Sequence, residues 1–182
     1  MILREENFEK CVIYLDDILI YGKNIQEHNE RLKIVLNKIR QSGVKLAPAK
    51  CAFMRDSIKY LGHIISEKGI KTDPDKIRAV TNWEIPNSNQ ELQSFMGFCN
   101  YYRRFIHAYG DLVRPLEDLL RVTNENSNRK NQKLQWENEH TTVFEKLKEA
   151  LSSAPILAFP TKNDIFILDT DASHFAMGAV LS

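Results

Sequence analysis

Long apolar runs and paired cysteines are missing from this 182-residue sequence, and glycine and proline are scarce. No run approaches the roughly 18 apolar residues of a membrane-spanning helix, and the first ten residues lack the apolar core of a secretory signal. The three cysteines form no CxxC pair and have no histidine at zinc-ligand spacing, which disfavours a disulfide framework or a zinc site. With 43% hydrophobic and 27% charged residues, the composition excludes collagen-like and wholly disordered chains. We therefore expect an intracellular globular protein, cytoplasmic or nuclear, with no membrane partner.

Acidic and basic residues nearly balance, giving a net charge of +1, but they are unevenly distributed. Residues 31–78 contain 12 Lys or Arg and 4 Asp or Glu, whereas the rest of the chain is net acidic. Such a basic block can bind a phosphate backbone, and it can equally be a solvated, lysine-rich surface. Charge alone leaves both interpretations open.

Hydrophobic periodicity predicts a mixture of short strands and amphipathic helices. The expected strands cover residues 11–22 (a hairpin with Asp16-Asp17 at or near its tip), 52–54, 58–66, 70–72, 165–168 and 177–181. The expected helices cover residues 24–42, 73–86 (capped by Asp73 before Pro74), 88–106 (opened by a Ser88–Glu91 capping box), 111–120 (kinked or broken at Pro115) and 139–152. In the last of these, the apolar face consists of Val143, Phe144, Leu147 and Leu151. Residues 122–133 are polar and without periodicity, which is typical of a linker. Because the sequence stops in or just after a strand, we expect it to be cut off at that end.

The sharpest local motif is Tyr14-Leu15-Asp16-Asp17. Two adjacent carboxylates repel each other unless the turn is fully solvated or a cation lies between them. Magnesium binds carboxylate oxygens, and two-metal phosphoryl transfer uses carboxylates shared between ions about 3.5–4 Å apart. An ordinary acidic turn is the alternative, since aspartate is common in turns. The motif alone does not decide between the two.

The stretch from CVIYLDDILIYG to IRAVTNW resembles, nearly continuously, the reverse transcriptase of gypsy-type LTR retrotransposons. The later blocks QELQSFMGFCNYYRRFI, WENEHTTVFEKLKEALSSAPILAFP and DTDASHFAMGAVLS resemble the next parts of the same Pol polyprotein, in the same order. The resemblance implies an α+β fold. Its expected parts are the C-terminal half of a polymerase palm with antiparallel hairpins and a helix (residues 1–72), a helical thumb (73–121), a linker (122–135) and the truncated α/β start of an RNase H-like domain (136–182).

The resemblance also implies roles for individual residues of the palm. Asp16 and Asp17 match the acidic pair that helps to hold the catalytic metal ions, and Tyr14 matches a residue near the primer end. Leu61, Gly62 and His63 match the primer grip, a hairpin that positions the growing 3′ end. A glycine there lets the backbone approach the nucleic acid closely, although a simple strand kink would also account for it.

In the thumb, the match implies a helix over residues 88–106 that lies along the minor groove of the template–primer. A glycine inside a helix lowers stability by about 0.5–1 kcal/mol relative to alanine. Close approach of another surface would explain why Gly97 stands there. The run Tyr101-Tyr102-Arg103-Arg104 combines ring faces with cations, which suits sugar and phosphate contacts, although the tyrosines could equally be core and the arginines plain surface. Asp171 matches the first carboxylate of the RNase H metal site, and a strand-end turn is its alternative.

The implied chemistry is RNA-directed DNA synthesis with Mg²⁺, or Mn²⁺ as a substitute. The implied partners are an RNA/DNA template–primer duplex, deoxynucleoside triphosphates and the remainder of the Pol polyprotein. Catalysis needs a third carboxylate and finger residues, expected before Cys11, and further RNase H carboxylates after Asp171. We therefore expect the chain to be inactive alone. The alternative is a non-catalytic nucleic-acid-binding module derived from a retroelement.

Overall fold

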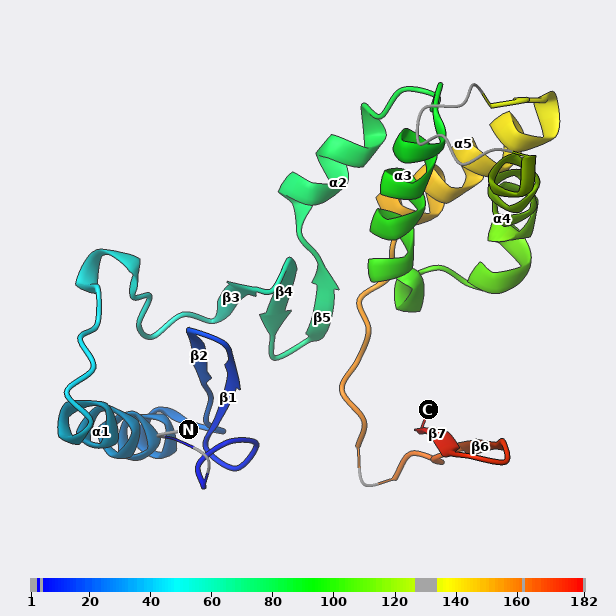
Figure 1. Cartoon of the computed structure of the whole chain (residues 1–182). Helices are drawn as coiled ribbons and strands as arrows, with labels where there is room; N and C mark the ends of the chain where they lie inside the picture. The colour runs from blue at the N-terminus through cyan, green and yellow to red at the C-terminus, as the bar shows by residue number, and fades with distance from the viewer. Residues whose placement is uncertain (1–2, 4, 127–133, 162, 182) are drawn as a thin grey trace. The chain divides into compact units, whose positions relative to one another are not determined.

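A computed structural model describes residues 3, 5–126, 134–161 and 163–181, which form two units (Figure 1). The first unit comprises Met1–Tyr60 and the second Leu61–Ser182. Helices and antiparallel strand pairs occur in both, as expected for an α+β chain. Among the described helices, none is long and apolar enough to span a membrane.

The first unit is a β-hairpin packed on one helix. Strands β1 (Cys11–Tyr14) and β2 (Asp17–Ile20) pair antiparallel, from Cys11 opposite Ile20 to Tyr14 opposite Asp17. Helix α1 (Ile25–Gln41) begins at Asn24, whose side chain accepts from the Glu27 amide at 2.9 Å. These elements confirm the predicted hairpin and helix. Their shared core is small and consists of Leu3, Cys11, Val35 and Ile39, flanked by Ile13, Ile18 and Ile20.

The rest of the first unit differs from the sequence prediction in one place. A 3₁₀ turn (η1, Pro48–Lys50) is followed by strand β3 (Ser57–Tyr60), and the described residues 51–56 contain no strand. The strand predicted over residues 52–54 is therefore wrong. Met54 has a positive φ of 53°, which breaks an extended run, and Phe53 is half exposed.

The second unit begins with a tight turn and a hairpin. Leu61 and Gly62 have φ values of 47° and 70°, so the single strand expected over residues 58–66 is interrupted there. Strands β4 (His63–Ser66) and β5 (Gly69–Thr72) then pair antiparallel, as predicted for the return after residue 68. A further antiparallel bridge joins Ile70 to Leu157 through two backbone hydrogen bonds of 2.8 Å.

Four helices follow: α2 (Pro74–Thr81), α3 (Asn89–Tyr101), α4 (Tyr109–Asn126) and α5 (Asn138–Ser152). Asp73 caps α2 as predicted, accepting from the Asp75 amide at 3.0 Å. Half of the predicted capping box forms at α3: Ser88 accepts from the Glu91 amide at 3.3 Å, whereas the Glu91 carboxylate accepts from Asn87. Helix α3 ends at Tyr101, and a separate 3₁₀ turn (η2, Arg103–Phe105) takes the place of its expected last turn.

Helix α4 continues through Pro115, so the predicted break is wrong. Val113, Leu116 and Leu119 are buried around that proline, and their packing outweighs the lost backbone hydrogen bond. The helix also extends to Asn126, into the predicted linker. Residues 127–133 of that linker lie outside the described residues, and Leu134 after them is buried.

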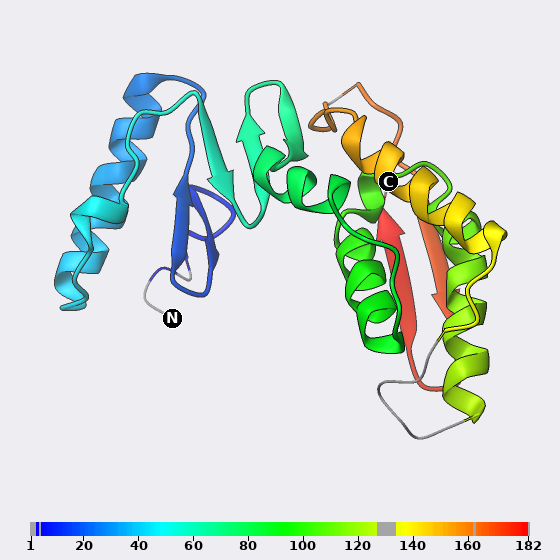
Figure 2. The same ribbon diagram turned by 90° about the horizontal axis from the view of Figure 1, so that it is seen from above.

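Helix α5 shares one hydrophobic core with α2, α3 and α4, and it lies beside α3 and α4 in both views (Figures 1 and 2). Its predicted apolar face is confirmed, because Val143, Phe144, Leu147 and Leu151 are all buried. The Phe144 ring lies 4.5 Å from the Phe95 ring, measured between centroids. Because the Ile70–Leu157 bridge follows directly, residues 138–157 are tied both to the helices and to the β4–β5 hairpin.

The chain ends in a second hairpin made of β6 (Leu168–Ala172) and β7 (Met177–Leu181). Strand β7 agrees with the prediction, but β6 begins where the predicted strand ends. Asp169, Thr170 and Asp171 therefore lie in a strand and not between the two expected strands. All ten strand residues are exposed.

Candidate metal and nucleic-acid site

The acidic pair lies at the bend of the first hairpin. Leu15 and Asp16 form the two-residue turn, and Asp17 is the first residue of β2, opposite Tyr14. Both carboxylates are exposed, and neither forms an ion pair with a described residue. Leu15 has a φ of 54° and is 85% exposed, so a bulky apolar side chain projects from the same turn.

Strand alternation explains why Tyr14 and Asp17 point away from the core. Successive side chains of a strand point to opposite faces of a sheet. Cys11, Ile13 and their partners on β2 pack towards α1, so Tyr14 and Asp17 fall on the other face. The hairpin is thus anchored on one face and presents its aromatic and acidic pair on the other.

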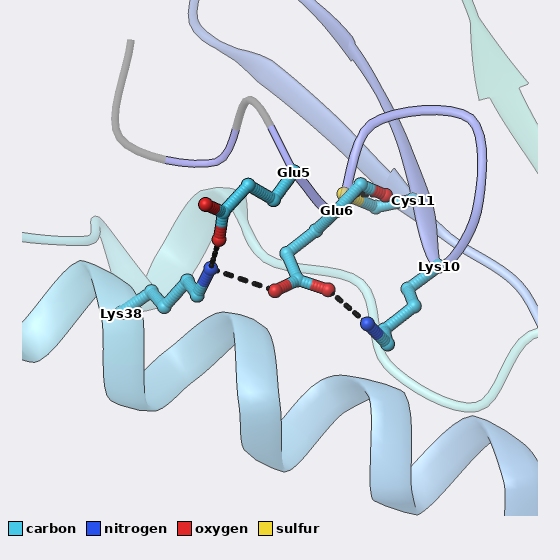
Figure 3. A network of polar contacts seen from close by, with 5 residues as sticks. All are labelled: Glu5, Glu6, Lys10, Cys11 and Lys38. Atoms are coloured by element: carbon cyan, nitrogen blue, oxygen red, sulfur yellow. Dashed lines mark hydrogen bonds and ion pairs between the residues drawn. The ribbon is translucent and has the colours of Figure 1, made fainter.

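A network of charged side chains secures the opposite end of β1 (Figure 3). The nearly buried Glu6 carboxylate contacts Lys10 and lies 2.7 Å from Lys38 on α1, and Lys38 also contacts Glu5 at 3.0 Å. Hydrogen bonds from Lys10 and Lys38 lower the pKa of Glu6, and the reciprocal bonds raise the pKa of Lys38. Burial raises the pKa of the adjacent Cys11 thiol. Glu5 and Glu6 are therefore fixed to α1, which anchors the start of β1 to that helix.

The acidic turn has the donor chemistry of part of a metal site. Carboxylate oxygens are the ligands that Mg²⁺ and Mn²⁺ take, and Asp16 and Asp17 offer two adjacent ones. Among the residues that the structure describes, no three His, Cys, Asp or Glu side chains gather into a metal-binding group. Asp16 and Asp17 therefore fit a divalent cation as contributors to a larger ligand set.

In the second unit, the structure brings together several residues predicted to bind nucleic acid. Leu61 and Gly62 form the turn before β4 and His63 is the first residue of β4, and the rings of Tyr101 and Tyr102 lie against them. A side chain at Gly62 would place its Cβ 3.0 Å from the Tyr102 hydroxyl. The lack of a side chain at position 62 therefore makes room for Tyr102 of the same chain. Neither sequence interpretation, close approach of nucleic acid or a strand kink, anticipated this contact.

The exposed side of α3 continues from this turn. Gly97 is exposed, and no described atom outside its own helix lies within 4 Å of an added Cβ. Tyr101 is four residues further along the same face and is 54% exposed. Arg103 and Arg104, both exposed, follow in η2, where Arg103 donates to the Asn100 side chain at 3.3 Å. A small, an aromatic and two basic residues are thus exposed in succession, from the last turns of α3 into η2.

Asp171 lies in β6 opposite Gly178, with its side chain exposed. Asp169, two residues earlier in β6, is exposed as well, but among the described residues no three His, Cys, Asp or Glu side chains gather around Asp171 to hold a metal ion. The structure brings it together with none of the residues of the α3 surface.

The sequence analysis did not foresee that Tyr102 and Phe105 would contact the Leu61–Gly62 turn and the His63 ring beside it. Tyr102 is only 2% exposed and lies three residues after the buried Cys99, which is a core position of α3. Phe105 stacks on His63 with centroids 5.8 Å apart. A tyrosine at a core position needs a hydrogen-bond partner for its hydroxyl, and this rule was the available signal for Tyr102. Phe105 carried no signal beyond being apolar.

Family models match both ends of the chain. Residues 2–65 match the reverse transcriptase (RNA-dependent DNA polymerase) family, and residues 136–182 match the RNase H-like domain found in reverse transcriptase. Two solved structures of a foamy viral protease–reverse transcriptase each align with 94% of this chain at 25% identity. One is in complex with double-stranded DNA (TM-score 0.77, 29% of that chain), and the other with an RNA/DNA hybrid (TM-score 0.76, 22% of that chain).

Curated relatives match along the whole chain. The retrovirus-related Pol polyproteins from transposons 297 and opus of Drosophila melanogaster are 38% and 36% identical, and this chain covers 16% and 18% of their lengths. The Tf2-3 polyprotein of Schizosaccharomyces pombe is 36% identical and 13% covered. The fold and both family matches define a reverse transcriptase segment followed by an RNase H-like segment. The chain belongs to the Pol polyproteins of gypsy-type LTR retrotransposons, which confirms the predicted family and the α+β fold class.

Proposed function

We propose that this chain supplies part of the catalytic and duplex-binding surface of an RNA-directed DNA polymerase, together with the start of its RNase H segment. The observation that carries the proposal is the exposed Asp16-Asp17 pair at the bend of a core-anchored hairpin, inside the segment that matches reverse transcriptases. Asp171 would contribute to the separate RNase H site.

The proposed reaction is attack of a primer 3′-hydroxyl on the α-phosphate of a deoxynucleoside triphosphate. The hydroxyl loses its proton, a new bond forms between its oxygen and the α-phosphorus, and the bond to the β-phosphate breaks to release pyrophosphate. Asp16 and Asp17 would hold Mg²⁺, or Mn²⁺ in its place, and a bound divalent cation supplies charge that stabilises the hydroxyl as alkoxide and the phosphate in the transition state. The hairpin's task is positional, because its buried face fixes the turn that carries the carboxylates. Tyr14, opposite Asp17 on the open face, would pack near the primer end.

Metal binding tests the role of the acidic turn directly. We expect Mn²⁺ added to the isolated chain to broaden the amide NMR signals of residues 14–18 and to leave those of α5 unchanged. The double variant D16N/D17N should lose this effect, whereas D56N, which removes an exposed carboxylate of the same unit, should keep it. Equal broadening in the wild type and D16N/D17N would contradict the metal-binding role.

Duplex binding tests the second surface, which we propose includes Leu61, Gly62, His63, Gly97, Tyr101, Arg103 and Arg104. Support comes from the open α3 face and from the foamy viral relatives, whose structures hold double-stranded DNA or an RNA/DNA hybrid. We expect salt-dependent binding of an RNA/DNA duplex, weakened in R103A/R104A, with the salt slope reduced by about 0.9 for each phosphate that the variant no longer neutralises. The control is R114A/R121A, which removes two exposed arginines of α4. Equal weakening in both double variants, or no binding at low salt, would refute this surface.

Polymerase activity of the chain alone is the remaining measurement. Because two carboxylates form only part of a two-metal site, we expect no primer extension on an RNA template beyond that of D16N/D17N. Extension by the wild type above this control would show that the chain completes its own site.

A further inference from the structure

Two adjacent tyrosines of the second unit donate hydrogen bonds to two adjacent carbonyl groups. The Tyr102 hydroxyl donates to the Gly62 carbonyl oxygen at 2.7 Å, and the Tyr101 hydroxyl donates to that of Leu61. The tyrosines close α3, and the carbonyls belong to the turn that opens β4. Forty residues of sequence separate each donor from its acceptor, so these bonds are long-range contacts.

Each of the two carbonyl oxygens accepts from a second donor as well. His63 Nδ1 lies 2.7 Å from the Leu61 oxygen, and the Asp73 amide lies 3.2 Å from the Gly62 oxygen. Because a carbonyl oxygen only accepts, the His63 ring carries a hydrogen on Nδ1. Leu61, a residue with a Cβ, is held in the left-handed region, a conformation that persists only where surrounding contacts impose it. Four donors supply those contacts.

The surroundings keep the tyrosines in place. The His63 ring lies 5.3 Å from the Tyr101 ring and 5.4 Å from the Tyr102 ring, and the two tyrosines meet edge to face at 4.9 Å. Tyr102 is nearly buried, and burial raises its pKa to about 12, so the hydroxyl stays protonated at neutral pH and remains a donor. The exposed ring of Tyr101 is left to face solvent while its hydroxyl is engaged within the chain.

We propose that Tyr101 and Tyr102 are positioning residues that fix the Leu61–Gly62 turn to the end of α3, so that the turn and the open face of α3 meet a nucleic-acid duplex as one rigid surface. The ligand in this inference, an RNA/DNA duplex, comes from the proposed function, whereas the fixing of the turn to α3 does not depend on it. The two hydroxyls do not touch the ligand; they act through the turn backbone.

Removing the hydroxyls alone tests the contact with little change in volume. In Y102F and in Y101F/Y102F, we expect hydrogen–deuterium exchange of the amides of residues 61–66 and Asp73 to rise about fivefold for each hydroxyl removed. The control Y21F removes a tyrosine hydroxyl that donates to the Phe8 carbonyl at 2.8 Å in the first unit, and it should leave these amides unchanged. Unchanged exchange in Y101F/Y102F would overturn the inference.

A positioning role is separated from general stability by duplex binding. We expect Y101F/Y102F to weaken binding of an RNA/DNA duplex about tenfold. The control L116A lowers the stability of the same unit through a wholly buried α4 residue and should keep the wild-type dissociation constant under conditions where it stays folded. Equal weakening in L116A would assign the effect to destabilisation and overturn the inference. If the wild type bound no duplex while exchange rose as expected, the proposed function would fail and the fixing of the turn would stand.

Discussion

Replacing Phe144 by alanine is predicted to destabilise the helical core of the second unit as a whole and not only its own helix. Phe144 is wholly buried and lies on α5, inside the segment that matches the RNase H-like family. Its ring packs on Phe95 of α3 at 4.5 Å, meets the Trp136 ring at 6.1 Å and lies under the Lys148 ammonium at 4.9 Å. The residue therefore joins the RNase H-like segment to the helices that precede it through packing.

The expected loss for Phe144→Ala is about 3–5 kcal/mol of unfolding free energy, the usual cost of emptying a buried aromatic site. For a unit of this size the loss corresponds to a fall in Tm on the order of 10 °C or more. Urea and thermal denaturation measure it, with the exposed neighbour variant E145A as a control expected to stay within about 0.5 kcal/mol. Hydrogen exchange should show α3 and α5 losing protection together. A loss below about 1 kcal/mol, or α3 amides that keep their protection while α5 opens, would refute the shared core.

Three further predictions concern single residues. Gly69→Ala should lower the free energy of unfolding by about 2–4 kcal/mol, measured by urea denaturation, because the φ of Gly69 is 123° and an added Cβ would lie 2.2 Å from the Leu157 carbonyl oxygen. A neutral substitution would show that the Ile70–Leu157 bridge does not persist in solution. Gly97→Ala should stabilise the chain by about 0.5–1 kcal/mol, because the space beside it is open, and yet weaken duplex binding; unchanged affinity would remove Gly97 from the binding surface. For Glu6, whose folded pKa is lowered, stability is fully present above its ordinary pKa of 4.5 and is lost as pH falls through the folded value. Acid titration followed by circular dichroism should show a shallower loss in E6Q, and identical curves would contradict the role of the network.

Much of the fold was predictable because local rules and tertiary packing agree. The alternating strands around Asp16-Asp17, the Asp73-Pro74 cap and the apolar face of α5 each follow a local pattern that the core then uses. Failures occurred where packing or turn geometry overrides local preference. Pro115 stays helical because buried neighbours hold α4, and the Leu61–Gly62 turn splits an apparently continuous strand.

The candidate site was only partly predictable. The acidic turn and the glycine of the Leu61–Gly62 turn stand out by residue type, and the structure places both at bends. The hydroxyl of Tyr102 could not be assigned, because its acceptor lies 40 residues away and only the fold brings the two together. The Glu6–Lys38 ion pair was not predictable either, because the sequence does not show which face of the helix the first residues contact.

The bridge between Ile70 and Leu157 sets a rule for exchanging parts among related polyproteins. A crossover at residue 136, where the RNase H-like match begins, would graft a foreign α5 onto α2, α3 and α4 and force side chains from different parents to interdigitate. A crossover just after Leu157 would carry α5 and its bridge over together. Chimeric chains joined at that later point should inherit an intact helical unit. The crossover point that preserves the fold therefore lies some twenty residues after the start of the RNase H-like family match.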